Sequence, residues 1–192
     1  MMKAGLSVLG AGMLLFAAPV LAAENIECSL TGYSDEQQKV LDTYQSGFTT
    51  KGLEDLERQA PMIDAVSDRI LVCAEQHSWS DEAADAAFYY ATTVIDERAL
   101  RAFSPSASSV VDRVDSELTA GERDRVWKII GAASDVEATE NEQGMNDEDV
   151  LFLGAILLKL DPESDDETIE SVGALLAMVS ARRVALAEFA TL

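Results

Sequence analysis

The stretch SDEAADAAFYYATTVIDERALRAF, residues 80–103, has the pattern of one long helix. Ser80 is a typical N-cap residue, and Asp81 and Glu82 place negative charge in the first turn, where it complements the helix dipole. Apolar residues then recur at helical spacing on one face: Ala84, Ala87, Phe88, Ala91, Val94 and Ile95. Because several of them are small, we expect a neighbouring helix to approach this face closely.

Helix start signals recur on both sides of this stretch. Capping boxes at Ser34–Gln37, Thr119–Glu122 and Ser164–Glu167 predict three further helix starts, and Asn146 is an N-cap residue for another. No stretch shows the alternation that a strand requires. We therefore predict an all-α fold, an irregular (orthogonal) bundle of about six helices.

Two helices carry more specific expectations. Pro61 is expected to open the main part of a helix that spans Leu53 to about Gln76, because proline is tolerated in a first turn. The segment Val150–Leu160 is almost continuously hydrophobic, which predicts a buried, central helix. At eleven residues it is too short to cross a membrane.

The N-terminus has the order of a secretory signal peptide. Lys3 precedes an uncharged apolar run from Ala4 to Leu21, Pro19 interrupts that run, and Val20–Ala22 offers small residues at peptidase spacing. We predict that residues 1–22 are a signal peptide, cut after Ala22 or one residue later. The remaining chain is then periplasmic or secreted.

Residues 23–192 are expected to form a single acidic helical domain. An uncleaved membrane anchor is the alternative, because the run from Ala4 to Ala23 is just long enough to span a bilayer. Lipidation of Cys28 is disfavoured, since Asn25–Glu27 lacks the small or apolar residues of a lipidation box. After cleavage we expect no membrane insertion.

Cys28 and Cys73 are the only cysteines in the chain. In an oxidising compartment the pair predicts one disulfide, and closing a loop of about 46 residues stabilises the fold by roughly 4 kcal/mol. A redox role is disfavoured because the two residues lack C-x-x-C spacing.

The net negative charge of the chain limits the classes of partner that it can bind. The chain has 14 Lys and Arg against 35 Asp and Glu, a formal charge of −21, which argues against nucleic acid and against anionic membranes. Hydrophobic residues make up 48% of the chain, so it is not a disordered acidic tail. A basic protein partner is permitted, and solubility alone is the alternative explanation of the charge.

His77 is the only histidine, so any catalytic triad must use it. It lies in the connection His77–Ser80, where it can also act as the C-terminal residue of a helix or pack on Trp79. No nucleophile-elbow motif surrounds a serine. A periplasmic hydrolase built on His77 or on a carboxylate pair such as Asp96–Glu97 is therefore the alternative to a binding protein.

The last candidate is an acidic cluster that continues into the apolar segment. Its members that we count as a possible ligand or partner surface, together with His77 and Trp79, are Glu140, Glu142, Asp147, Glu148 and Asp149. No EF-hand spacing is present, so no metal or other cofactor is predicted, and weak Ca²⁺ binding stays open. For the pair Arg182–Arg183, salt bridges to nearby acids are favoured over binding of an anionic ligand. The sequence thus predicts a non-enzymatic binding or interaction protein for a basic partner.

Overall fold

A computed structural model describes residues 24–49, 55–133 and 145–192. These residues form helices and no strand, which confirms the all-α prediction, with seven α-helices rather than about six. The elements are a short 3₁₀ helix η1 (Ile26–Leu30), α1 (Asp35–Ser46), α2 (Leu56–His77), α3 (Asp81–Phe103), α4 (Pro105–Glu117), α5 (Ala120–Ala133), α6 (Asp147–Leu160) and α7 (Asp166–Phe189).

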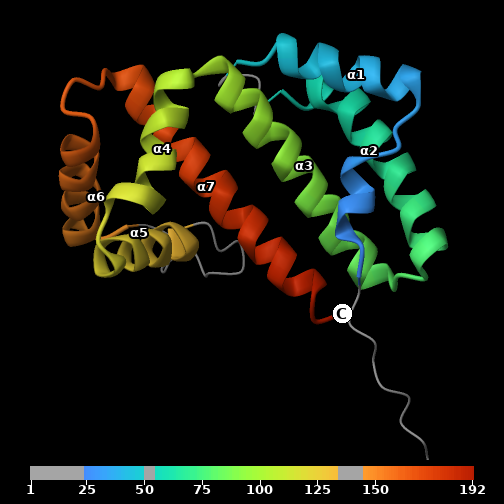
Figure 1. The fold of residues 1–192 in the computed structure, drawn as a ribbon. Helices are drawn as coiled ribbons and strands as arrows, with labels where there is room; N and C mark the ends of the chain where they lie inside the picture. Colours follow the sequence, from blue (N-terminus) through green and yellow to red (C-terminus); the bar gives the residue numbers. More distant parts are fainter. Residues whose placement is uncertain (1–23, 50–54, 134–144) are drawn as a thin grey trace, which may run out of the picture.

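Two long antiparallel helices, α3 and α7, form the centre of the bundle (Figure 1). Phe189 at the end of α7 packs edge-on against Trp79, just before α3, with ring centroids 5.0 Å apart. At the other end, the Ser106 and Thr168 hydroxyls are hydrogen-bonded at 3.3 Å. The small residues of α3 lie in this centre, fully buried: Ala83, Ala87, Ala91 and Ala99. They allow the close approach that the sequence predicted.

The remaining helices cover the two sides of this pair. α1 and α2 pack against α3, and α4 and α5 pack against α7. α6 packs against α4 and lies at the outer edge of the bundle (Figure 1).

Most predicted helix starts are confirmed. Ser34 and Gln37 form the complete capping box, and Ser80 and Asn146 each accept the predicted cap hydrogen bond. The box at Ser164–Glu167 is wrong: Asp165 caps α7 by accepting from the Thr168 amide, and the Ser164 hydroxyl instead donates to Asp161.

The expected role of Pro61 is also wrong. Asp55 caps α2 at Leu56, more than one turn earlier, and Pro61 lies inside the helix. A strong cap upstream of the proline therefore decides where this helix begins.

The predicted position of the apolar segment is a further error. Val150, Leu151 and Leu158 of α6 are 53%, 74% and 66% exposed, and only Ile156 and Leu160 are buried. Continuous hydrophobicity shows that a helix favours burial, but it does not provide neighbours for every face. In the part of the chain that is described, no helix combines the length and hydropathy needed to cross a membrane.

The predicted disulfide is confirmed. Cys28 and Cys73 are bonded, with their Cα atoms 5.9 Å apart, and the bond fastens η1 to α2. Arg69 donates to the Cys28 carbonyl at 3.0 Å, and the Trp79 indole N–H donates to the Glu24 carbonyl at 2.9 Å. The N-terminal segment is thus attached covalently and by side-chain hydrogen bonds.

Candidate functional site: an apolar groove between α6 and α7

α6 stands apart from α7, and a cavity of about 490 Å³ separates them. Every side chain that lines it is apolar or is glycine. The walls and floor define what we call the α6–α7 groove: Val150, Leu153, Gly154 and Leu157 from α6, Ile169, Gly173 and Ala177 from α7, Val114 from α4, and Val126 and Ile130 from α5.

The groove opens to solvent on one side. Its floor is buried at Val114 and Val126, whereas Val150 and Ile169 on its two walls are exposed. Met145, at the start of the described segment before α6, is also exposed and lines the same cavity. Exposed apolar residues that are contiguous, rather than scattered singly, mark interaction sites.

Ion pairs hold α6 in this outlying position. Arg125 of α5 contacts Glu148 at 2.8 Å and Asp149 at 3.1 Å, and its guanidinium lies 4.2 Å from the centre of the Phe152 ring. Lys159 contacts Glu122 of α5 at 2.7 Å. The Lys159 and Thr119 hydrogen bonds lower the pKa of Glu122 to about 2. α6 is therefore fixed to α5 by polar contacts, and its apolar side remains free to line the groove.

Two glycines widen the groove. Gly154 of α6 and Gly173 of α7 both line it, and a Cβ added at either position would meet no heavy atom within 4 Å. Glycine inside a helix costs about 1 kcal/mol relative to alanine. No internal contact requires either glycine, so both leave space in the groove.

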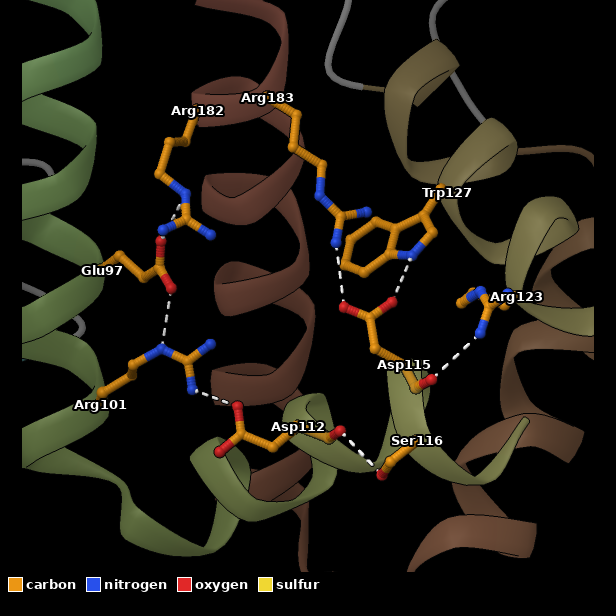
Figure 2. Close-up of polar contacts among 9 residues, drawn as sticks. All are labelled: Glu97, Arg101, Asp112, Asp115, Ser116, Arg123, Trp127, Arg182 and Arg183. Atoms are coloured by element: carbon orange, nitrogen blue, oxygen red, sulfur yellow. Dashed lines mark hydrogen bonds and ion pairs between the residues drawn. The ribbon is translucent and has the colours of Figure 1, made fainter. Parts of the chain in front are cut away.

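The other wall, α7, is fixed by two charge networks (Figure 2). In the first, the buried Glu97 carboxylate of α3 accepts from Arg101 at 2.8 Å and makes an ion-pair contact with Arg182 at 3.2 Å, with poorer hydrogen-bond geometry. Arg101 also donates to Asp112 of α4 at 2.9 Å. This network joins α3, α4 and α7.

In the second network, Asp115 of α4 accepts from Arg183 at 3.0 Å and from the Trp127 indole at 3.1 Å (Figure 2). The Arg183 guanidinium lies 3.9 Å from the centre of the Trp127 ring. Of the two roles expected for Arg182 and Arg183, the salt bridges are confirmed.

The carboxylates of Asp96 and Glu97 have separate partners. Asp96 accepts from the Tyr44 hydroxyl, whereas Glu97 contacts the arginines. Burial raises the pKa of Asp96, and the hydrogen bond from Tyr44 opposes that shift. The two carboxylates therefore do not form the facing pair that a hydrolase of this kind would need.

His77 and Trp79 lie away from the groove. The His77 ring stacks on Trp79 with centroids 5.8 Å apart, and Trp79 packs on Phe189. Phe189 lies sixteen residues beyond Gly173 on α7, or about 24 Å along the axis. Within the described ranges, no serine or carboxylate is hydrogen-bonded to His77.

The predicted acidic cluster is only partly described. Asp147, Glu148 and Asp149 occupy the first turn of α6, beside the groove, and Glu140 and Glu142 lie outside the described residues. Among the residues that are described, no group of three or more His, Cys, Asp or Glu side chains could hold a metal ion. The expected surface is thus divided, with its described acids near the groove and His77 and Trp79 elsewhere.

The groove itself was not predicted from the sequence. A cavity depends on how far apart two helices pack, which hydrophobic periodicity does not reveal. The one usable indication was a glycine in the interior of each apolar helix, at 154 and 173.

Comparison of this chain with protein-family models, with curated proteins and with solved structures gave no match.

Proposed function

We propose that this protein is a binding protein that takes an apolar group into the α6–α7 groove. The observation that carries the proposal is the cavity of about 490 Å³, which is lined only by apolar side chains and glycine and has an exposed mouth. Its volume lies within the range of roughly 300–1,000 Å³ that is typical of ligand pockets.

The groove can supply useful affinity without any polar contact. Burying eight methylene groups contributes roughly 6 kcal/mol, at about 0.8 kcal/mol each. Part of that is lost to the entropy of immobilising the ligand. The fixed positions of α6 and α7 reduce any further cost of closing the groove. A net free energy of roughly 4–6 kcal/mol corresponds to dissociation constants of about 0.04–1 mM.

Export of the protein is part of the same proposal. The N-terminal pattern that ends near Ala22 predicts cleavage, and the disulfide is compatible with an oxidising compartment. The test is the mass of the native protein from cells and its count of free thiols. Retention of residues 1–22 together with two free thiols would contradict export.

The binding test uses N-phenyl-1-naphthylamine, a neutral apolar dye that fluoresces when it leaves water. We expect saturable fluorescence with the full chain. Gly173 lines the groove and a Cβ there would meet no heavy atom within 4 Å, so the leucine of Gly173→Leu should occupy groove space and weaken dye binding at least tenfold. Absence of saturable binding, or unchanged binding by Gly173→Leu, would overturn the proposal.

Gly121→Leu is the matched control. Gly121 is also helical, and a Cβ there also meets nothing within 4 Å, but it lies in the first turn of α5 and does not line the groove. It should bind the dye as the wild type does. Urea unfolding of both variants verifies that each remains folded.

A further inference from the structure

Residues 145–181, which contain α6 and the part of α7 that lines the groove, are strongly acidic. The segment 145–181 contains one basic residue, Lys159, and this lysine is paired with Glu122. The same segment contains these acids: Asp147, Glu148, Asp149, Asp161, Glu163, Asp165, Asp166, Glu167 and Glu170. The arginine that reaches this segment from α5, Arg125, is itself shared between Glu148 and Asp149. An unbalanced negative charge therefore surrounds an apolar groove.

This charge is present at both ends of the groove. α6 and α7 run in opposite directions, so their N-terminal turns lie at opposite ends of the groove (Figure 1). Asp147 and Glu148 are exposed at the start of α6, and Asp166 and Glu170 are exposed beside Ile169 of α7. An anionic lipid headgroup would be repelled at either end, whereas a cationic group would be attracted.

The exposed apolar surface is larger than the cavity. Leu151, Gly154, Ala155 and Leu158 lie on one stripe of α6, at the i, i+3, i+4, i+7 spacing of a helix face, and Leu151, Ala155 and Leu158 are exposed. A small molecule inside the cavity would leave Leu151 and Leu158 in water. A helix that lies along α6 would cover them and insert side chains into the groove.

We propose that the α6–α7 groove binds a basic amphipathic helix of a partner protein; this inference rests on the proposed function and names its ligand class. Apolar side chains at i, i+3, i+4 and i+7 of the partner enter the groove, as in other helix-in-groove complexes. Lysines and arginines on its flanks meet the acids at both ends. Gly154 and Gly173 let the partner helix approach closely. α6, with fourteen residues, offers a wall about 21 Å long, enough for roughly four turns.

The test is a pair of fluorescent synthetic helices of about four turns. Both carry leucine at the i, i+3, i+4 and i+7 positions; one carries lysine at the other positions and its matched control carries glutamate. Fluorescence anisotropy should show micromolar binding of the lysine peptide and no binding of the glutamate peptide. Because exposed charges are screened by salt, raising the ionic strength should weaken binding at least tenfold.

Three variants separate groove binding from general charge attraction. Gly173→Leu should weaken binding of the lysine peptide at least tenfold, and Gly121→Leu should leave that binding unchanged. The double variant Asp166→Asn, Glu170→Gln should weaken binding of the lysine peptide severalfold. It should leave dye binding unchanged, because neither residue lines the groove. Equal binding of both peptides, or a lysine peptide insensitive to Gly173→Leu, would overturn the inference.

The two proposals can fail separately. If the dye binds and the lysine peptide does not, the apolar groove stands as a binding site and the basic-helix inference is overturned. If neither binds, the proposed function falls as well. Sedimentation with phosphatidylcholine vesicles, without peptide binding, would assign the apolar face to a membrane and overturn the inference.

Discussion

Gly154 of α6 and Gly173 of α7 line the same groove, and neither has a neighbouring atom where its Cβ would lie. Replacing each with alanine therefore adds helix propensity without a clash. We expect Gly154→Ala and Gly173→Ala each to raise the free energy of unfolding by about 0.5–1 kcal/mol, as measured by urea denaturation.

Gly32 is the informative contrast for these alanine variants. Its φ is +73°, and an added Cβ would lie 2.8 Å from the Arg69 guanidinium. Gly32→Ala should destabilise the protein by about 1 kcal/mol or more, through backbone strain and displacement of Arg69. A loss of stability in Gly154→Ala comparable to that of Gly32→Ala would show that the groove is filled in the free protein.

The glycines also show why the fold was easier to predict than the site. Helix starts such as Ser34–Gln37 and Ser80 are local: the capping side chain and its amide partner lie three residues apart in sequence. The disulfide was predictable because Cys28 had one possible intramolecular partner, Cys73. The exposure of α6 depends on which helices pack beside it, and its composition, typical of a buried helix, predicted the opposite.

The Cys28–Cys73 bond should contribute a large share of stability. It joins residues 45 apart in sequence. Closing a loop of that size lowers the entropy of the unfolded chain and so raises its free energy by roughly 4 kcal/mol. We expect Cys28→Ser, Cys73→Ser, or reduction by dithiothreitol, to lower the free energy of unfolding by about 3–4 kcal/mol in urea denaturation. A reduced protein with an unchanged midpoint would contradict this role.

Glu97 should be the most sensitive charge in the bundle. It is 5% exposed and compensates Arg101 and Arg182 from two different helices. Both arginines are partly exposed to solvent, so Glu97→Gln should cost less than the 3–5 kcal/mol of a fully buried pair. We expect it to lower the free energy of unfolding by about 2 kcal/mol in chemical denaturation.

Glu117→Gln is the matched control. Glu117 pairs with Arg113 on the surface at 2.7 Å, and its loss should change stability by less than about 0.5 kcal/mol. Equal effects of the two variants would show that the buried ion pairs of Glu97 contribute no more to stability than a surface pair does.

Only one of the two arginine contacts of Glu97 could be predicted from the spacing of residues in the sequence. The i, i+4 pair with Arg101 was predictable from spacing alone, and it is present. The contact with Arg182 joins residues 85 positions apart in the printed sequence and requires α3 and α7 to lie side by side. The sequence favoured a salt bridge for Arg182 but contained no indication of which acid it would meet.

Asp96 gives a prediction about pH. Burial raises the pKa of its carboxyl in the folded protein, so the folded state holds this proton more tightly than the unfolded state does. The resulting stabilisation is fully present below the unfolded pKa and is lost as the pH rises through the folded pKa. At pH 7 the folded protein therefore bears the cost of a partly buried carboxylate, with the Tyr44 hydroxyl as its hydrogen-bond donor.

Asp96→Asn removes that cost and keeps an oxygen that can accept from Tyr44. We expect it to be more stable than the wild type at pH 7, by up to about 1 kcal/mol, and to lose this advantage near pH 3, in urea denaturation at each pH. Tyr44→Phe is the opposite change: it leaves the carboxylate buried without its donor, so it should destabilise more at pH 7 than at pH 3. If Asp96→Asn and the wild type differ by the same amount at both pH values, the Asp96 carboxyl titrates alike in the folded and unfolded protein, and its burial carries no pH-dependent cost.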